Sequence, residues 1–333
     1  MSFYKLPLSY IHIELTTRCN AACPMCLRNI NGDMKNPYLK LDDFDIKWLD
    51  KIDIPVGKKV QLCGNYGDPI VYPHLFDFIK AWKEKFNTPI TIMTNGGARN
   101  TDWWKELAEI LDNRCKVVFG IDGLEDTNHL YRRNVKWNKL MENAKAFIDA
   151  GGRAWWKFIV FKHNQHQIED AKILAKKMKF ESFEKLKTNR FDRGVLPVLD
   201  KNGNNLYNIY EPNISKKGFL DKNPYRAVAN KDPARVKIDC YAKKESSMYI
   251  AADGRVYPCC NTGYHYSGPN RIEMEIAQET QTPYSLTNSK VSEIINGDFF
   301  RGFEKTWTST PYKKCHRVCG YKRGILHKIE DLK

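Results

Sequence analysis

The chain has no apolar run that approaches the ~18 residues of a membrane-spanning helix. Its first fifteen residues also lack the continuous apolar stretch and the small-residue cleavage site of a secretory signal peptide. We therefore expect a cytoplasmic protein with no membrane partner. In that reducing compartment the ten cysteines are not expected to pair as disulfides, so they point to metal binding, redox chemistry or core packing.

The sequence also has no low-complexity tract and no repeat beyond an alternation of strands and helices. With 42% hydrophobic and 12% aromatic residues among 333, it can bury a large core, which excludes a disordered chain and a small disulfide scaffold. Acidic residues are the scarce charge, 39 against 54 Lys and Arg, which leaves a formal net charge of +15. That excess suggests a partner or a bound group of negative charge.

An apolar strand followed by a helical pattern recurs six times in residues 1–190. The expected strands are Tyr10–Leu15, Lys59–Cys63, Pro89–Thr94, Lys116–Ile121, Arg153–Phe161 and Phe183–Thr188. Strands that alternate with helices favour parallel βαβ units. Since a full eight-unit barrel needs ~250 residues, we predict an α/β fold with a partial (β/α)6 TIM-type barrel over residues 1–190.

The alternation ends after Arg190. Residues 191–235 are rich in Asn, Pro, Gly and Lys and predict a bridging segment of turns. Beyond it, Ser247–Ala252 and Arg255–Tyr257 flank the dipeptide Asp253-Gly254, which is the clearest β-hairpin pattern in the chain. We therefore predict a smaller C-terminal α+β domain over residues 236–333.

Three thiols follow the first strand within eight residues: Cys19, Cys23 and Cys26, with the spacing C-x3-C-x2-C. They could be small core residues on one face of a helix. Pro24 argues against that helix, because proline removes a backbone donor and clashes with the preceding turn. A metal site is favoured instead. Zinc would need a fourth ligand, and no nearby His supplies one, whereas a four-iron cluster held by three thiolates leaves one iron free.

With this motif after the first strand of a partial barrel, the sequence resembles the radical S-adenosylmethionine (SAM) superfamily. The resemblance implies that Cys19, Cys23 and Cys26 hold a four-iron four-sulfur (4Fe-4S) cluster whose open iron binds SAM. It also implies an enzyme that cleaves SAM reductively to methionine and a 5′-deoxyadenosyl radical, which abstracts hydrogen from a substrate. Met25 stands where the family often has an aromatic residue.

The turns after the second, third and fourth strands fit the same resemblance. The turn over residues 64–69 resembles the family's G-G-E-P motif, which offers backbone carbonyls and a carboxylate to the methionine amine of SAM. The next turn resembles the frequent T-N-G motif, although each could be ordinary turn chemistry. Because they end successive strands on one rim, we predict that they bind SAM together. The predicted SAM-binding residues are Gly67, Asp68, Pro69, Thr94, Asn95 and Asp122.

A second group of cysteines lies in the C-terminal part: Cys240, Cys259, Cys315 and Cys319. A zinc ribbon is one explanation, although ribbons generally bring their thiols as two close pairs. The pattern C-x13-G-x4-C with a later pair instead resembles the twitch domain, the shortened form of the SPASM domain behind many radical SAM barrels. The resemblance implies a second, auxiliary 4Fe-4S cluster on these four thiols. Cys260 adjoins Cys259, and the spacing from Gly254 selects Cys259.

Cys63 ends the second strand beside the 64–69 turn. A thiol there could return a hydrogen atom to a substrate radical, as in radical SAM peptide epimerases, although core packing is the favoured explanation. The catalytic residue is therefore unassigned, with Cys63 as a candidate. Trp155, Trp156, Lys157 and Lys162 on the fifth strand are candidates for lining the barrel mouth.

Basic residues gather in Lys176–Arg190 and Tyr312–Lys328. The first explanation is that they balance the negative charge of the clusters. The second is that they dock an acidic electron donor such as a flavodoxin. The third is that they bind nucleic acid, although no RNA-binding motif accompanies them.

The leading hypothesis is a radical SAM oxidoreductase that modifies a peptide or protein side chain. One alternative is a radical SAM dehydrogenase or modifying enzyme that acts on a small carbohydrate or on a nucleotide in RNA. An alternative from a different class is a non-catalytic, zinc-bearing protein that binds nucleic acid.

Overall fold

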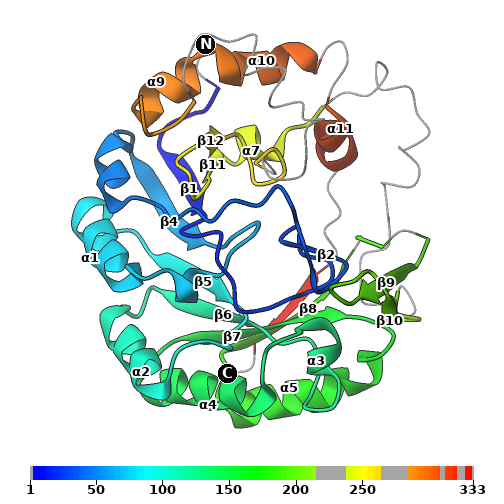
Figure 1. Ribbon diagram of the computed structural model, residues 1–333. Coiled ribbons are helices and arrows are strands. Elements are labelled where there is room, and N and C mark those ends of the chain that lie inside the picture. The colour runs from blue at the N-terminus through cyan, green and yellow to red at the C-terminus, as the bar shows by residue number, and fades with distance from the viewer. Residues whose placement is uncertain are drawn as a thin grey trace.

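The computed structural model describes residues 3–188, 190–191, 193–214, 238–263, 284–307, 312–320 and 327–331. At its centre is a curved sheet with the strand order β12-β11-β1-β4-β5-β6-β7-β8-β13 (Figure 1). The six expected strands are present and are parallel neighbours, which confirms the partial barrel. They are β1 (Leu8–Ile13), β4 (Val56–Leu62), β5 (Ile90–Thr94), β6 (Lys116–Gly120), β7 (Ala154–Val160) and β8 (Ser182–Lys187).

Helices lie between these strands in the chain and on the outer side of the sheet (Figure 1). They are the 3-10 helices η1 (Ile46–Lys51), η2 (Pro69–Val71) and η3 (Gln165–Gln167), and the α-helices α1 (Leu75–Phe86), α2 (Thr101–Ile110), α3 (Asn128–Tyr131), α4 (Trp137–Asp149) and α5 (Ile168–Lys177). In α1 the apolar residues Phe78, Ile79 and Trp82 are buried, and the helix ends at Asn87 in the left-handed conformation.

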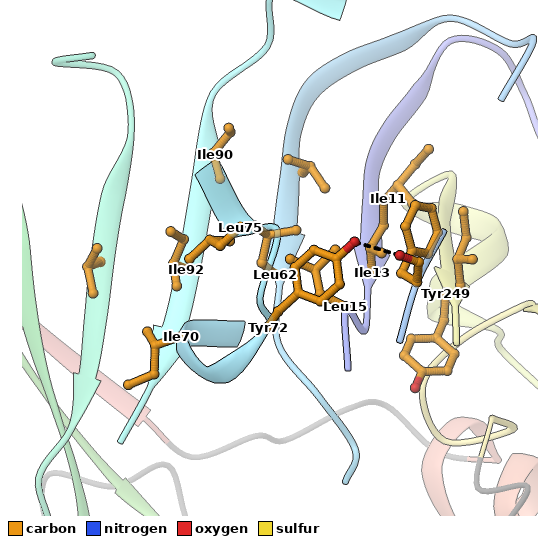
Figure 2. Close-up of a cluster of buried hydrophobic side chains, with 14 of the residues drawn as sticks. Ile11, Ile13, Leu15, Leu62, Ile70, Tyr72, Leu75, Ile90, Ile92 and Tyr249 are labelled. Atoms are coloured by element: carbon orange, nitrogen blue, oxygen red, sulfur yellow. Dashed lines mark hydrogen bonds between the residues drawn. The ribbon is translucent and has the colours of Figure 1, made fainter. Parts of the chain in front are cut away.

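The two faces of the sheet differ in polarity. On the face toward the helices, Ile11, Val60 and Ile90 are in register, and so are Ile13, Leu62 and Ile92. These side chains pack with residues of η2 and α1 into a continuous core (Figure 2). On the opposite face, His12, Gln61 and Thr91 are in register and point into the barrel. The inside of the barrel is therefore polar next to the cysteine loops.

The C-terminal part of the chain adds strands to both edges of the barrel sheet. The expected hairpin is present as β11 (Ser247–Ile250) and β12 (Val256–Tyr257), and β11 pairs in parallel with β1. At the other edge, β13 (His327–Asp331) pairs antiparallel with β8. Both edges of the partial barrel are covered in this way. The expected boundaries at 190 and 235 stay a prediction.

Residues 195–210 differ from the expected segment of turns. They form an antiparallel hairpin of β9 (Val195–Leu199) and β10 (Asn205–Tyr210). Val198 on β9 and Ile209 on β10 are buried, whereas the other apolar residues of the two strands are half-buried or exposed. The prediction of turns was wrong here because Pro197 interrupts the apolar run of β9 and Asn208 interrupts β10, and Pro and Asn are both uncommon inside strands. The rest of the predicted bridging segment, residues 215–235, lies outside the described residues.

The remaining elements are short. They are β2 (Asn29–Ile30), β3 (Met34–Lys35), α7 (Tyr241–Lys244), α9 (Val291–Asn296), α10 (Asp298–Thr306) and α11 (Lys313–Cys319). The last three helices lie near the β11–β12 edge of the barrel (Figure 1). Within the described ranges no helix has the length and apolar character to cross a membrane.

Candidate metal and cofactor sites

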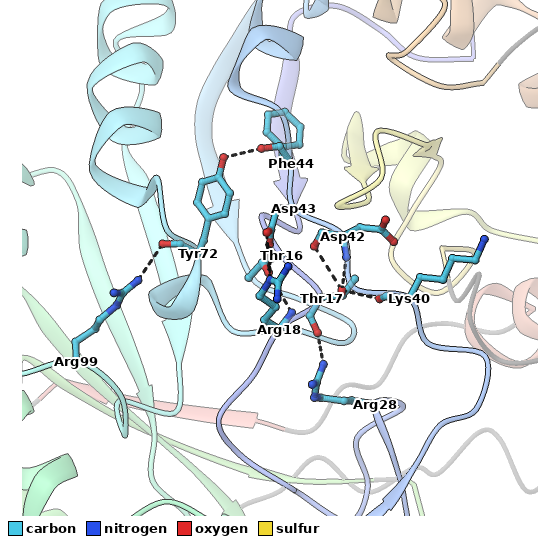
Figure 3. Close-up of polar contacts among 10 residues, drawn as sticks. All are labelled: Thr16, Thr17, Arg18, Arg28, Lys40, Asp42, Asp43, Phe44, Tyr72 and Arg99. Carbon is cyan, nitrogen blue, oxygen red and sulfur yellow. Dashed lines mark hydrogen bonds and ion pairs between the residues drawn. The ribbon is translucent and has the colours of Figure 1, made fainter.

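The backbone that leads from β1 into the first cysteine loop is fixed by side chains (Figure 3). Thr16 Oγ1 donates a hydrogen bond to Asp43 at 2.5 Å, and Thr17 Oγ1 donates to the carbonyl of Lys40 at 2.8 Å. The guanidinium of Arg28 donates to the carbonyl of Thr17. The loop therefore starts from a fixed point at the C-terminal end of β1.

The loop over residues 19–26 contains turns and no helix, as Pro24 predicts. Cys23 is buried, and Cys19 and Cys26 are half-buried. Burial is the main reason that the pKa of the Cys23 thiol rises to about 11. Burial also raises the pKa of Cys19, with smaller contributions from the other two thiols. The three thiols thus lie near enough to repel one another as thiolates, and a cationic group would relieve that repulsion.

This donor set fits an iron–sulfur cluster better than a single ion. Among the described residues, no three His, Cys, Asp or Glu side chains stand close enough to surround one metal ion. Zinc holds its sulfur ligands at about 2.3 Å. A four-iron cluster places its own irons and sulfides between the thiolates and so accepts ligands that lie farther apart.

The turn over residues 64–69 follows β4 and packs against the cysteine loop. A Cβ atom on Gly67 would lie 1.7 Å from the carbonyl oxygen of Thr16, so only glycine fits there. The backbone N–H of Asp68 donates to the carbonyl of Arg18 at 2.8 Å. Pro69 then opens η2. The turn that the sequence assigns to SAM is thus docked on the residue before Cys19.

Asp68 is bound to the protein through both carboxylate oxygens. Oδ2 accepts from the backbone N–H and the side-chain Nδ2 of Asn95, each at 2.7 Å, and Oδ1 accepts from the N–H of Ile70 at 3.2 Å. Burial raises the pKa of Asp68, and these hydrogen bonds oppose the rise. Asp68 therefore shapes the turn, and its expected contact with the SAM amine stays a prediction.

Asn95 also reaches the cysteine loop. Its Nδ2 atom lies 3.7 Å from Cys19 Sγ and 3.0 Å from Asn20 Oδ1. Thr94 is buried, and its Oγ1 accepts from the N–H of Gly96 at 3.0 Å. Thr94 and Asn95 therefore lie on the same rim as Cys19, where the sequence places them.

Asp122, after β6, is fully buried and forms an ion pair with Arg132, at 2.6 Å between Oδ2 and Nε. Its Oδ1 accepts from the N–H of Ile159 at 2.6 Å. The Nη1 atom of Arg132 lies 3.9 Å from Cys23 Sγ, and a Cβ on Gly120 would lie 2.4 Å from Nη2. Sequence reasoning missed Arg132, because no pattern marks one arginine in a loop as a neighbour of a cysteine 109 positions away.

Glu14 was also missed, although a Glu inside the apolar run around β1 could have drawn attention. It is 1% exposed. Its Oε1 accepts from the backbone N–H groups of Tyr66 at 2.7 Å and Gly67 at 3.0 Å, and its Oε2 accepts from the Tyr249 hydroxyl at 2.5 Å. Burial raises the pKa of Glu14 to about 7, against the effect of these hydrogen bonds.

The second group of cysteines surrounds one pocket. Its lining comprises Cys240, Pro258, Cys259, Asn261, Thr262, Phe303, Trp307, Lys314, Cys315, Val318 and Cys319. The thiols of Cys240 and Cys319 are hydrogen-bonded, which together with burial raises the pKa of Cys240. The N–H of Asp239 donates to the carbonyl of Cys319 at 2.8 Å. The structure therefore brings the four predicted thiols together from three separate segments.

Cys259 and Cys260 lie in different surroundings. Cys259 packs with Cys240 and Cys319, and Cys260 packs against the core of the barrel. The carbonyl of Cys260 accepts from Asn65 Nδ2 at 2.9 Å. Burial raises the pKa of Cys260 to about 12, with contributions from Cys259 and then Cys63. Of the two adjacent thiols, only Cys259 lines the pocket described above.

Cys63 is half-buried at the end of β4, close enough to Cys260 for their charges to interact. Burial raises its pKa to about 11, and the charge of Lys157 on β7 opposes that rise. Lys157 Nζ lies 3.9 Å from a carboxylate oxygen of Glu184. Trp156 is fully buried on the other face of β7, where it packs on Phe180. Trp156 was therefore a wrong candidate for the barrel mouth, because successive residues of a strand face opposite sides.

Comparisons with known proteins agree with this arrangement. Residues 13–175 match the family model described as the Radical SAM superfamily, and residues 240–320 match SPASM, an iron–sulfur cluster-binding domain. Both matches confirm the resemblances drawn from the sequence.

One similar curated protein is the "Tungsten-containing aldehyde ferredoxin oxidoreductase cofactor-modifying protein" of Pyrococcus furiosus, 31% identical over 109 residues, which are 31% of this chain and 28% of that one. Another is the "7,8-dihydro-6-hydroxymethylpterin dimethyltransferase" of Methanocaldococcus jannaschii, 26% identical over 141 residues, 40% of this chain and 27% of that one. The matches thus span less than a third of these two relatives.

Solved structures share the fold over most of the chain. Streptococcus suis SuiB bound to precursor peptide SuiA has a TM-score of 0.57 and 15% identity, over 94% of this chain and 71% of that one. The protein anSMEcpe with bound AdoMet has a TM-score of 0.56 and 14% identity, over 94% of this chain and 86% of that one. At these identities the likeness establishes the fold alone.

Proposed function

Because the chain belongs to the radical SAM superfamily and has a C-terminal SPASM iron–sulfur domain, we propose that its two groups of thiols hold two 4Fe-4S clusters. In this proposal Cys19, Cys23 and Cys26 hold the SAM-binding cluster. The observation that carries it is the docking of the 64–69 turn on the backbone of Thr16 and Arg18, directly before the cysteine loop, with Cys26 Sγ 3.9 Å from the carbonyl oxygen of Asn65. The superfamily assignment excludes the non-catalytic, zinc-bearing alternative.

The protein is a radical SAM enzyme, with SAM and a 4Fe-4S cluster as cofactors and a SPASM domain of the kind that binds auxiliary iron–sulfur clusters. A cluster bound there would supply the electron for reductive cleavage of SAM, and hydrogen abstraction from the substrate would follow from it. The chain's own contribution is to hold three thiolates and the turn in fixed positions. Gly67 permits the close approach of the two loops, and Asp68 with Asn95 fixes the turn to the end of β5.

For the auxiliary cluster we propose Cys240, Cys259, Cys315 and Cys319 as ligands. The common pocket supports these four. The separate surroundings of Cys260 support Cys259 as the ligand of the adjacent pair. Apolar side chains such as Phe303 and Trp307 complete the lining, which would keep water from a cluster held there.

A peptide or protein side chain is the proposed substrate, for maturation or modification. The support is that SuiB and anSMEcpe, which share the fold, have been crystallised with peptides. A carbohydrate or a nucleotide in RNA is the alternative. Cys63 remains the candidate for returning hydrogen to a substrate radical, since it directly precedes the 64–69 turn and lies near the charge of Lys157.

An acidic electron donor such as a flavodoxin is the proposed partner. Lys176, Lys177 and Lys179, at the end of α5, are exposed and could meet it. Residues 321–326 of the second basic stretch lie outside the described residues. Reduction of the protein by flavodoxin should then slow as salt rises.

Iron and sulfide analysis of the reconstituted protein tests the cofactor proposal, with about eight irons per chain expected for two cubanes. The triple replacement of Cys19, Cys23 and Cys26 by Ala should leave about four irons and abolish reductive cleavage of SAM. Cys115→Ala is the control, because Cys115 is a buried thiol at the opposite end of the strands, where it accepts from the N–H of Ile90. SAM cleavage by the triple variant would overturn the assignment.

Deuterium transfer tests the substrate proposal. With deuterated peptide substrates, deuterium should appear in 5′-deoxyadenosine. Transfer only from a deuterated sugar or RNA would favour the alternative.

A further inference from the structure

Glu14 suits its surroundings as an ionised carboxylate. An ionised carboxylate accepts hydrogen bonds at both oxygens and donates none. All three hydrogen-bond partners of Glu14 are donors: the N–H groups of Tyr66 and Gly67 and the hydroxyl of Tyr249. A Gln side chain would turn its own N–H₂ toward one of these donors. The site is therefore specific for a carboxylate.

The three donors come from two distant parts of the chain. Tyr66 and Gly67 belong to the 64–69 turn, whereas Tyr249 lies 235 positions from Glu14, on β11. Strand pairing fixes Tyr249 beside β1 (Figure 2), since Ile13 is in register with Ile250 and the N–H of Glu14 donates to the carbonyl of Ile250 at 2.9 Å. One buried side chain thus joins the SAM turn to the SPASM part of the chain.

Asn65 makes a second connection from the same turn. Its Nδ2 donates to the carbonyls of Cys260 at 2.9 Å and of Gly263 at 3.4 Å. These acceptors lie one and four positions after Cys259, a proposed ligand of the auxiliary cluster. The 64–69 turn is therefore attached to the C-terminal part at two points. Its backbone N–H groups reach Tyr249 by way of Glu14, and the side chain of Asn65 reaches Cys260 directly.

We propose that Glu14 is a positioning residue that, with Tyr249 and Asn65, couples SAM binding to the folding and cluster loading of the SPASM part. This inference rests on the proposed function, because it takes the 64–69 turn as part of the SAM site. A cluster on Cys240, Cys259, Cys315 and Cys319 would fix residues 259–263, and these residues together with β11 hold the turn. The coupling is reciprocal. If a loaded auxiliary cluster raises the affinity for SAM by some factor, bound SAM raises the affinity for that cluster by the same factor.

SAM dissociation constants of the anaerobically reconstituted full chain test this inference, measured by equilibrium dialysis. Glu14→Gln, Tyr249→Phe and Asn65→Ala should each weaken SAM binding by about tenfold, the effect of losing a hydrogen bond that positions a charged group. Iron content should stay at the wild-type value in all three. The combination of Glu14→Gln with Tyr249→Phe should cost less than the product of the single effects, because the two residues share one hydrogen bond.

Tyr4→Phe is the matched control. Tyr4 is also a buried tyrosine whose hydroxyl binds the C-terminal part, donating to the carbonyl of Pro258 at 3.1 Å, and within the described residues that hydroxyl has no hydrogen bond to the turn. It should leave SAM affinity unchanged. If Tyr4→Phe weakens SAM binding as much as Tyr249→Phe does, the effect is general loosening of the fold and the inference is overturned.

A second measurement follows the coupling from the other side. Replacing Cys240 and Cys315 together by Ala should weaken SAM binding by a similar factor while the first cluster stays loaded. If SAM affinity is unchanged in this variant and in the three above, the coupling does not exist, although the proposed function stands. If wild-type protein with both clusters fails to bind SAM, the proposed function itself is wrong.

Discussion

Asn95 donates two hydrogen bonds to a single oxygen of Asp68, one from its backbone N–H and one from its side-chain amide, both at 2.7 Å. The same amide nitrogen lies 3.7 Å from Cys19 Sγ. The turn after β4, the end of β5 and the first cysteine loop are therefore one connected unit. A change in any of the three is expected to disturb SAM binding.

Asp68→Asn tests this unit. The Asn amide would place a donor against the donors of Asn95, and a lost hydrogen bond to a buried charged group costs roughly 1.5–3 kcal/mol. We expect lower stability by urea denaturation and weaker SAM binding. Asp50→Asn, at an exposed carboxylate on η1, serves as the control. Wild-type SAM affinity in Asp68→Asn would mean that the residue is only part of an ordinary turn.

Gly67→Ala should prevent assembly of the first site. Its Cβ would lie 1.7 Å from the carbonyl oxygen of Thr16, so the turn and the cysteine loop would have to separate. Gly151→Ala is the control: it has a positive φ of 90° and meets nothing within 4 Å, so it carries only backbone strain of about 1–2 kcal/mol. Iron analysis should show the loss of about four irons in Gly67→Ala alone. A full complement of iron in that variant would contradict the contact.

Arg132→Met should lower both the stability of the protein and the reduction potential of the first cluster. It leaves the buried Asp122 carboxylate unpaired, which costs about 3–5 kcal/mol, and it removes a positive charge 3.9 Å from Cys23 Sγ. The reduction potential of the first cluster should fall, because the reduced cluster carries more negative charge. Adding Asp122→Asn should restore much of the stability and, because it removes a negative charge that also acts on Cys23, part of the potential. An unchanged potential, in a redox titration followed by electron paramagnetic resonance, would remove Arg132 from any tuning role.

Cys259→Ser and Cys260→Ser form a matched pair. Only Cys259 lines the pocket with the other three proposed ligands. Cys259→Ser should therefore lose the auxiliary cluster, whereas Cys260→Ser should keep it. Iron content and spectra of the two variants decide the matter, and the reverse pattern would transfer the ligand role to Cys260.

Glu14 should make the stability of the unloaded protein depend on pH. Its pKa in the folded protein is about 7, raised by burial from an ordinary value of 4.5. Between these two pKa values the folded state binds more protons than the unfolded state. The stabilisation that Glu14 contributes is therefore fully present below about pH 4.5 and is lost as the pH rises through 7. The difference in unfolding free energy between wild type and Glu14→Gln should shift by at most about 3 kcal/mol across this range.

The charged and titratable neighbours of Glu14 are Tyr249, Asp253, Cys26 and Cys63. The Gln variant keeps all of them, so the difference isolates Glu14. A difference that does not vary with pH would show that Glu14 ionises at an ordinary pKa.

The sequence was most informative where the chemistry is local. Cys19, Cys23 and Cys26 lie within eight residues, and Pro24 among them excludes a helix, so their loop could be predicted without the fold. Strand and helix alternation depends on side-chain periodicity within short windows, which explains why the six barrel strands were predicted with shifted ends. The hairpin at residues 195–210 escaped because Pro197 and Asn208 lie inside its strands, and both residue types are typical of turns.

Contacts between distant parts of the chain could be decided only by the tertiary structure. The pairing of β11 with β1 places Tyr249 against Glu14, and the loop after β6 places Arg132 beside Cys23. The direction in which Cys259 and Cys260 point is set by the elements packed around them, although the two residues are adjacent in sequence. The sequence alone determined the chemistry of the thiols and the alternation of the barrel, since both arise from neighbouring residues. The partners of Glu14, Arg132 and Cys259 come from other segments of the chain, in part more than a hundred residues away. Strand pairing and packing bring them together, and no local sequence pattern marks such contacts.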